Sequence, residues 1–339
     1  MEMQSYNLES FGDVAGLALV ERPIPEPGAG EVLVRIRATS INYRDLMVLD
    51  GTYPVPAKAG TIPLSDGAGE IVAVGGAVTR FAVGDRVAGS YFTHWVGGRL
   101  TAELARQQLG SSHDGMLTTF RALGEDSIVK VPDHLSFEQA ATLPCAALTA
   151  WSGVSAGRPI LPGEHVLVVG GGGVAMFAIQ FAKLFGARVI SVTSKPDKAE
   201  LLQGLGAHHV LVSSETTDWD GRVVELTGGK GVDHVVEAVG PATLARSIRC
   251  CALDAEIALA GAFAGADGFD AKALSGRLVT IRRLAVGSRS AFEAMNDAIA
   301  LHGLKPVIDR IFPFSEAPLA YRHFAAMRHT GKVVIGGAE

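Results

Sequence analysis

The segment VLVVGGGGVAMFAIQFAKLFGARVISVTSKPDK, residues 166–198, decides the fold of this chain. An apolar strand ends at Val169, and Gly170, Gly172 and Ala175 then occupy the three small positions of the pattern G-x-G-x-x-G/A. The residues that follow carry apolar side chains at helical spacing, stop at a glycine and continue into a second apolar strand. Strand, glycines, helix and second strand in these lengths predict a βαβ unit.

The spacing of the glycines indicates what this unit binds. Gly170 permits the tight turn, and Gly172 lets the backbone approach a pyrophosphate with no Cβ in the way. The amide groups at the start of the following helix would face the diphosphate. We therefore expect a dinucleotide at this turn, with a plain structural turn as the alternative.

The tip of the second strand indicates which dinucleotide is bound. The tip reads Val192-Thr193-Ser194-Lys195. In a site for NAD(H), a carboxylate at this place binds the free 2′-hydroxyl of the ribose. Here a hydroxyl and an ammonium stand there instead. Ser194 and Lys195 can donate hydrogen bonds to a 2′-phosphate, which favours NADP(H). In the alternative, Lys195 is a solvated loop lysine and Asp197 reaches the ribose.

The remainder of the 339 residues divides into two domains. Over residues 1–124, short alternating runs such as EVLVRIRA (31–38) lie between glycines and prolines and predict a small antiparallel β-barrel. Over 125–289, apolar strands alternate with helical segments, which predicts a doubly wound parallel sheet. The segment 290–339 returns to helix, loop and strand, so we expect it to complete the first domain. The expected fold class is α/β.

Composition restricts the partners. The net charge is −5, and no Lys/Arg cluster offers a surface that would follow phosphates, so we expect no nucleic acid partner. The longest apolar stretch is interrupted by glycines and charges and predicts no membrane span. Cys145, Cys250 and Cys251 make no disulfide framework, and the N-terminus does not read as a signal peptide. These features predict a cytoplasmic protein that acts on a small-molecule substrate.

The motifs described so far, together with INYRDLMVLDGTYP (41–54), LPCAALTAW (143–151) and GKVVIG (331–336), resemble the medium-chain dehydrogenase/reductase superfamily. The resemblance covers essentially the whole chain. It implies a GroES-like barrel domain, a Rossmann domain and NAD(P)-dependent hydride transfer in the cleft between them. The pattern is more similar to the zinc-independent quinone oxidoreductase and enoyl reductase branch than to the zinc-dependent alcohol dehydrogenases.

The same resemblance indicates which residues would bind a catalytic zinc ion. It places the three zinc-ligand positions of the alcohol dehydrogenases at Asn42, Ser65 and Cys145. Only Cys145 is a good ligand for Zn²⁺, which prefers thiolate, imidazole or carboxylate, although the neighbouring Asp66 could contribute an oxygen. We therefore expect no metal and a packed thiol at Cys145, with a catalytic zinc bound through that thiol as the alternative.

The resemblance also implies roles for single residues. Tyr53 is the candidate proton donor or enolate partner, with an ordinary turn tyrosine as the alternative. Asn42 would hydrogen-bond the nicotinamide ribose or the substrate oxygen, and Asp45 would fix the local loop. The implied cofactor contacts are Thr149, Gly170, Gly172, Gly173, Val174, Ser194, Lys195, Val239, Gly261, Phe263, Ser288, Arg289 and Lys332.

These expectations favour one reaction. Without a metal to stabilise an alkoxide, reduction of an activated C=C bond is less demanding than alcohol oxidation, because hydrogen bonds can hold the enolate that forms. We expect an NADPH-dependent reductase of enones, enoyl thioesters or quinones. The alternatives are a zinc-free NAD(P)-dependent alcohol dehydrogenase or carbonyl reductase, and an NADPH-binding sensor or structural protein with little turnover. By analogy with relatives, the strand RRLAVGSR (282–289) predicts a sheet edge that pairs in a homodimer.

Overall fold

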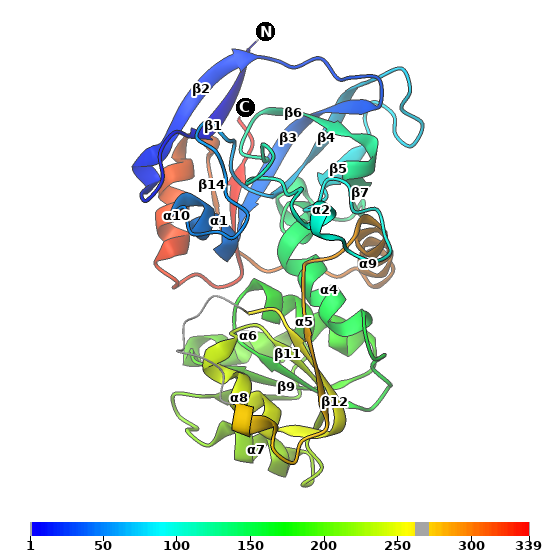
Figure 1. Ribbon diagram of the computed structural model, residues 1–339, viewed down its shortest axis with the longest axis vertical. Coiled ribbons are helices and arrows are strands. Elements are labelled where there is room, and N and C mark those ends of the chain that lie inside the picture. The colour runs from blue at the N-terminus through cyan, green and yellow to red at the C-terminus, as the bar shows by residue number, and fades with distance from the viewer. Residues whose placement is uncertain (1, 262–270, 339) are drawn as a thin grey trace. The chain divides into compact units, whose positions relative to one another are not determined.

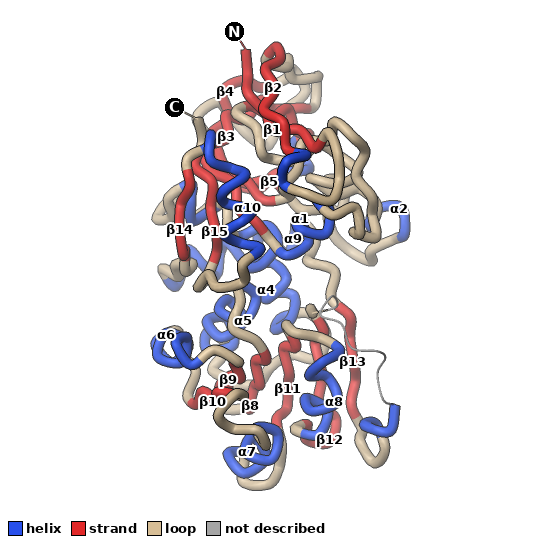
Figure 2. The backbone as a smooth tube through the Cα atoms, turned by 90° about the vertical axis from the view of Figure 1, so that its left-hand side faces the viewer, coloured by secondary structure: helices blue, strands red, loops and turns tan. Residues whose placement is uncertain are grey.

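The computed structural model describes residues 2–261 and 271–338 and divides the chain into two compact units. Unit 1 comprises Met1–Leu148 and Gly287–Glu339, and unit 2 comprises Thr149–Val286. The N-terminal and C-terminal segments therefore build one unit together, as the sequence predicted, while the middle of the chain builds the other. Figure 1 labels most elements of both units, and Figure 2 adds labels for β8, β10, β13 and β15.

Unit 1 contains a seven-stranded sheet in the order β14-β15-β3-β4-β5-β7, with β6 also paired to β3. Its pairs are antiparallel except β14 and β15, which run parallel. A separate antiparallel ribbon is formed by β1 and β2. The strands are β1 (Glu2–Leu8), β2 (Leu17–Pro23), β3 (Glu31–Ile41), β4 (Asp66–Val74), β5 (Arg86–Gly89), β6 (Phe120–Gly124), β7 (Ile128–Lys130), β14 (Ile308–Phe312) and β15 (Lys332–Gly336).

The helices of unit 1 are α1 (Tyr43–Leu49), α2 (Ala102–Ala105), α3 (Phe137–Ala140), α9 (Arg289–His302) and α10 (Ala317–Ala325). Helix α10 packs on β14 and β15, where its buried Tyr321 and Phe324 join Val333 and Ile335 in one core cluster. Helix α1 contributes Val48 to the same cluster. This core holds the start of α1 next to the C-terminal strand, and the candidate site uses both.

Unit 2 is a parallel sheet of six strands in the order β10-β9-β8-β11-β12-β13. Numbered within the unit this order is 3-2-1-4-5-6, the doubly wound Rossmann arrangement that the sequence predicted. Figure 2 shows these strands in red. They are β8 (His165–Val169), β9 (Arg188–Thr193), β10 (His209–Val212), β11 (Val232–Glu237), β12 (Cys251–Leu259) and β13 (Val279–Arg283).

Helices cover the sheet of unit 2. They are α4 (Leu148–Ser155), α5 (Gly173–Leu184), α6 (Ala199–Gly204), α7 (Trp219–Leu226) and α8 (Pro241–Arg249). Helix α5 packs on β8 and β9, whereas α8 packs on β11 and β12. Nearly every side chain of β8, β9 and β11 is buried, as expected for parallel strands with helices on both faces.

The division between the units differs from the predicted boundaries at 124/125 and 289/290. It falls after Leu148 and after Val286. The first difference arises because β7 pairs with β5 and α3 packs on β3 and β4, so residues beyond 124 still belong to the sheet of unit 1. The second arises because Arg289 N donates to Trp95 O at 2.9 Å, which ties the start of α9 to unit 1.

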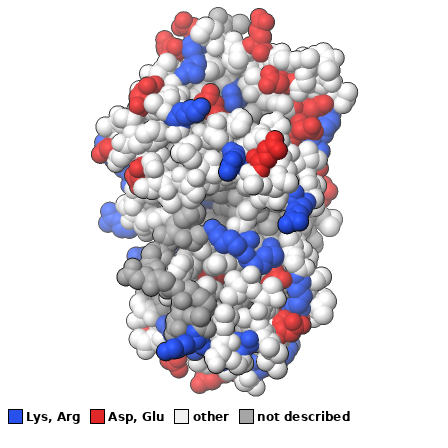
Figure 3. All heavy atoms as spheres, viewed as in Figure 1, with Lys and Arg blue, Asp and Glu red and all other residues white. Residues whose placement is uncertain are grey.

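Two surface properties accompany this fold. Across residues 2–261 and 271–338, no helix is both long enough and apolar enough to cross a membrane. Basic and acidic side chains are interspersed among uncharged ones on the face drawn in Figure 3.

Candidate active site

The glycine turn of unit 2 has the geometry of a ligand cradle. Gly170 follows β8 with φ +122°, a conformation that side-chain-bearing residues rarely adopt, and α5 begins at Gly173 with Gly172 as its N-cap. A Cβ added at Gly172 would meet no atom within 4 Å. The protein itself therefore does not require glycine at position 172, and open space lies in front of the start of a twelve-residue helix.

The tip of β9 lies beside this turn. Lys195 N donates to Thr193 Oγ1 at 3.2 Å, and Ser194, Lys195 and Asp197 are exposed. Lys198 is buried, and its ammonium donates to Gly171 O at 3.1 Å. Lys198 was not among the predicted site residues, yet it ties the β9 tip to the glycine turn and places a positive charge next to that turn.

The tips of β11 and β12 complete this edge of unit 2. The buried Glu237 carboxylate accepts from Val239 N and Gly240 N, both at 3.0 Å, and burial raises the pKa of this carboxyl group. Gly261 approaches this turn so closely that a Cβ on it would lie 2.3 Å from Val239 C. Because the carboxyl ends of parallel strands share one sheet edge, Gly170, Ser194, Val239 and Gly261 lie along it. Phe263 lies outside the described residues.

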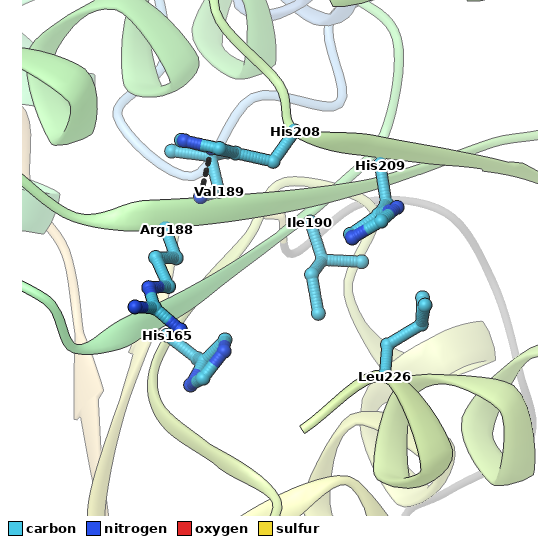
Figure 4. Close-up of a pocket in the computed structure, with 7 residues that line it drawn as sticks. All are labelled: His165, Arg188, Val189, Ile190, His208, His209 and Leu226. Atoms are coloured by element: carbon cyan, nitrogen blue, oxygen red, sulfur yellow. Dashed lines mark hydrogen bonds between the residues drawn. The ribbon is translucent and has the colours of Figure 1, made fainter. Parts of the chain in front are cut away.

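A pocket of about 270 Å³ lies at the opposite edge of the same sheet (Figure 4). Its lining comes from the amino ends of β8, β9 and β10 and includes His165, Arg188 and His209. His208 Nδ1 accepts a hydrogen bond from Val189 N at 3.0 Å, shown as the dashed line. This pocket is therefore separate from the predicted dinucleotide site.

The start of α1 organises a buried polar cluster in unit 1. Asp45 Oδ2 accepts from Asn42 N at 2.8 Å, which fixes the first turn of the helix. Arg44 Nη1 donates to Leu109 O at 2.8 Å and lies 3.3 Å from Asp45 Oδ1. The Arg44 side chain is 4% exposed, and its Nε and Nη2 have no hydrogen-bond partner within the described part of the chain. Asp45 thus fixes the local loop geometrically.

Two tyrosines share the Arg44 guanidinium. Its Cζ lies 4.7 Å from the ring centroid of Tyr53 and 5.0 Å from that of Tyr91. Both hydroxyls lie 3.0 Å from Gln108 Oε1, and Gln108 Nε2 donates to Ala105 O, which points Oε1 toward the tyrosines. Tyr53 also borders an apolar pocket of about 230 Å³ lined by Phe11, Val48, Gly51, Pro56 and Ala57.

Lys332 brings a second buried cation into unit 1. Its ammonium, on the first residue of β15, donates to Ile41 O at 2.8 Å and to Asn42 Oδ1 at 2.5 Å. Asp66 Oδ2 lies 3.8 Å from the same nitrogen and also accepts weakly from Cys145 N at 3.4 Å. We call Asn42, Arg44, Asp45, Tyr53, Asp66, Tyr91, Gln108, Cys145 and Lys332 the polar cluster.

The electrostatics of the polar cluster keep its thiol protonated. Desolvation, followed by the Asp66 carboxylate, raises the pKa of Cys145 far above its usual value. Desolvation also raises the pKa of Asp45, to about 6, although Arg44 opposes the shift. Cys145 lies on an irregular, π-helical turn at Leu143–Ala147 and is partly exposed. The charged groups that act on this thiol are the carboxylates of Asp66 and Asp45 and the cations of Lys332 and Arg44.

The other predicted site residues fall in both units. Ser288 Oγ caps α9 by accepting from Ala291 N at 3.2 Å, and Arg289 pairs with Asp126, so both side chains are engaged within unit 1. Thr149 is the first residue of unit 2 and is buried. The structure thus groups Asn42, Asp45, Tyr53 and Lys332 in the polar cluster and the glycine-turn residues in unit 2.

Comparison with known proteins explains this combination of units. Residues 28–133 match the family described as alcohol dehydrogenase GroES-like domain, and residues 173–301 match that described as zinc-binding dehydrogenase. The chain is 40% identical over 314 residues to a zinc-type alcohol dehydrogenase-like protein of Schizosaccharomyces pombe, covering 90% of each chain. The chain belongs to the medium-chain dehydrogenase/reductase superfamily. It is a nicotinamide-dependent oxidoreductase of that superfamily.

Other relatives carry different names. A quinone oxidoreductase of Pseudomonas aeruginosa is 33% identical over 321 residues, covering 91% of this chain and 92% of that one. A solved structure described as an NAD-dependent alcohol dehydrogenase superposes with a TM-score of 0.90 at 32% identity, covering 98% of this chain and 99% of that one. Similarity thus extends to both dehydrogenases and quinone reductases of the superfamily.

The zinc in the family description can be tested against the residues present. Asn42 and Ser65 offer an amide and a hydroxyl, and Ser65 Oγ donates to Asp66 Oδ1 at 2.8 Å. The remaining position, Cys145, carries a thiol, and the Lys332 ammonium donates to the Asn42 oxygen. Zn²⁺ binds thiolate, imidazole and carboxylate, and a cation at this place would oppose it. This donor set does not fit a zinc ion.

Proposed function

We propose that this oxidoreductase reduces activated C=C bonds or quinones with NADPH and uses no metal ion. The observation that carries the proposal is the polar cluster, whose donor groups and buried cations suit a substrate oxygen that becomes negatively charged. An enone, an enoyl thioester and a quinone all develop such an oxygen when hydride is added.

The chemistry needs little from the protein beyond these groups. NADPH, when bound, supplies the hydride, which adds to the β-carbon of the substrate. The electron pair of the C=C bond then moves onto the carbonyl oxygen as an enolate, and a proton added at the α-carbon completes the reduction. Hydrogen-bond donors stabilise that enolate.

Tyr53 is our candidate for the proton donor. Each hydroxyl of the Tyr53–Tyr91 pair carries one hydrogen, so at most two of the three contacts among Tyr53, Tyr91 and Gln108 Oε1 are hydrogen bonds at one time. The Arg44 guanidinium lies over both rings and adds positive charge beside the hydroxyl pair. The apolar pocket beside Tyr53 suits an uncharged substrate portion.

The preference for NADPH rests on the tip of β9. Ser194 and Lys195 are exposed there, and the neighbouring Lys198 adds positive charge at the glycine turn. These groups attract a 2′-phosphate, whereas NADH carries none.

A substrate panel tests the proposed function. The wild-type protein, dialysed against a chelator and checked for metal by elemental analysis, is assayed with NADPH and NADH on enones, enoyl thioesters, quinones, aldehydes and alcohols. We expect NADPH-dependent reduction of enones, enoyl thioesters or quinones that survives chelation. Alcohol oxidation that is lost on chelation and restored by zinc would contradict the proposal.

We further propose that the protein is a homodimer. Among the described residues, strand β13 lies at the edge of the sheet of unit 2 and pairs with β12 alone, so the backbone groups on its other side can meet a second copy across a two-fold axis. Light scattering should then give twice the 35.3 kDa of one chain. A mass of one chain at micromolar concentration would argue against pairing.

A further inference from the structure

The contact between Lys332 and Asn42 fixes the orientation of an amide. The Lys332 ammonium can only donate hydrogen bonds, so the atom of Asn42 at 2.5 Å from it is the accepting Oδ1. The Nδ2 group of Asn42 must then point away from the ammonium. Lys332 is 3% exposed and Asn42 is 8% exposed, so both side chains are held by buried surroundings.

The Nδ2 group of Asn42 is a donor without an acceptor. It is buried, and it has no hydrogen-bond partner among residues 2–261 and 271–338. A buried amide that leaves its N–H groups unpaired is costly, so such a group calls for a partner outside the described residues, such as a water, an ion or a ligand. Asn42 therefore has one side bound to a cation, and on the other side it carries a buried donor with no acceptor among the described residues.

We propose that Asn42 Nδ2 donates to the carbonyl oxygen of the substrate, and that Lys332 is the positioning residue that orients this amide and stabilises the charge on that oxygen. The ammonium would then do electrostatically what a bound metal ion does in the zinc-dependent members of the superfamily. This inference rests on the proposed function, because it assigns a partner to the oxygen of an enone, enoyl thioester or quinone.

The same geometry discriminates between two acceptors. A ribose hydroxyl of the cofactor stays neutral throughout the reaction, whereas the substrate oxygen acquires negative charge. The cation behind the Asn42 amide polarises its N–H groups and strengthens the hydrogen bond as that charge grows. Loss of Lys332 should therefore lower kcat and leave the affinity for NADPH unchanged.

The variants are chosen so that the fold is kept. Lys332→Met alone would leave the Asp66 carboxylate buried without its cation, so the test uses Lys332→Met combined with Asp66→Asn. Asn42→Asp is the second variant, because it keeps an acceptor for the ammonium while it removes the Nδ2 donor and places a negative charge next to the substrate oxygen. Lys305→Met, at an exposed lysine of unit 1, is the matched control.

Three measurements are made on each variant: the thermal midpoint, the dissociation constant for NADPH, and kcat and KM for the best substrate of the wild type. A fourth readout does not need turnover. It is the carbonyl stretching frequency of a ¹³C-labelled saturated ketone, the reduction product of an enone substrate, bound together with NADP⁺.

In the wild type we expect the carbonyl stretching frequency of the bound ketone to be lower than that of the free ketone. For the double variant and for Asn42→Asp we expect folded protein, unchanged NADPH affinity, a kcat lowered by about 100-fold and loss of most of this lowering of the frequency. Lys305→Met should behave as wild type. A folded double variant with wild-type kcat and carbonyl shift would overturn the inference, and a change confined to NADPH affinity would assign Asn42 to the ribose instead. If the wild type itself reduces no enone, enoyl thioester or quinone, the proposed function fails independently of the variants.

Discussion

The hydroxyl oxygens of Tyr53 and Tyr91 lie 2.5 Å apart in unit 1. The two residues are separated by 38 positions in the sequence, and Tyr91 lies beyond β5 whereas Tyr53 lies beyond α1. Tyr91 is fully buried, and burial raises its pKa well above the ordinary value. Tyr53 is half-buried and borders the apolar pocket. The more accessible Tyr53 hydroxyl thus contacts the hydroxyl of Tyr91, which stays protonated.

Replacing Tyr53 by Phe removes the accessible hydroxyl and keeps the contact between Tyr91 and Gln108. We expect turnover of the enone or quinone substrate to fall by about 100-fold, as for loss of a general acid, with little change in NADPH affinity. Tyr91→Phe is the control, because it leaves the Tyr53 hydroxyl bonded to Gln108, and it should retain most of the turnover. Steady-state kinetics check both, and wild-type turnover in Tyr53→Phe would mean that solvent supplies the proton.

Gly172→Ala separates ligand binding from folding. The added methyl group meets no atom of the protein, and φ at this position is −94°, so the thermal midpoint should stay the same. The methyl group would occupy the space predicted for the pyrophosphate, so NADPH affinity should fall by about 10-fold or more, which is a loss of at least about 1.4 kcal/mol. Isothermal titration checks the affinity.

Gly170→Ala is the opposite case, because φ +122° is strained for alanine and the variant should unfold at lower temperature. For Gly172→Ala, affinities for NADPH and NADH equal to those of the wild type would contradict the binding of a dinucleotide at this turn.

The combined change Ser194→Asp and Lys195→Ala tests the choice of cofactor. A carboxylate at the tip of β9 repels a 2′-phosphate and can accept from the two ribose hydroxyls of NADH. We expect NADPH to bind at least about 10-fold more weakly while NADH affinity is kept or improved. Lys183→Ala, at an exposed lysine of the same unit, should change neither affinity. Equal loss for both cofactors would remove the argument from the 2′-phosphate.

His234 should make the stability of unit 2 depend on pH. It is fully buried on β11, its Nε2 donates to Gly153 O at 2.7 Å, and burial lowers the pKa of its imidazole below the ordinary value of 6.5. The unfolded chain therefore takes up a proton near pH 6.5 that the folded chain does not. Stability from this group is present above pH 6.5 and is lost as the pH falls below it.

The variant His234→Asn can keep a donor but cannot titrate. Its thermal midpoint should therefore fall less than that of the wild type between pH 7 and pH 5.5. Parallel losses in the two proteins over that range would show that another group is responsible.

The dinucleotide unit could be predicted from the sequence because its signal is local. The glycine turn, α5 and β9 follow one another within 33 residues, and each has a period or a turn residue of its own. The strand order of unit 2 then follows from the general rules of parallel sheets. The boundary near residue 125 could not be predicted, because β7 joins the sheet of unit 1 through pairing with β5, which is distant in sequence.

The polar cluster was predicted only in part. Asn42, Asp45 and Tyr53 come from one continuous motif, whereas Lys332 is 290 positions from Asn42 and was expected only near the cofactor. Arg44 and Gln108 were missed. The one available signal for Arg44 was its place between Asn42 and Asp45 on a short helix whose next turn is apolar. No local pattern marks Gln108, whose contacts to the tyrosines depend on how separate loops fold together.

Strand β15 has a consequence for how the protein is made. Unit 2 is one continuous stretch and can fold while synthesis of the chain is still in progress. The sheet of unit 1 must wait for β15, which pairs with β3 some three hundred residues upstream, and such distant pairing is slow to form. A nascent chain would therefore fold its nucleotide-binding unit well before Lys332 on β15 reaches Asn42, so we expect the enzyme to become active only late in translation.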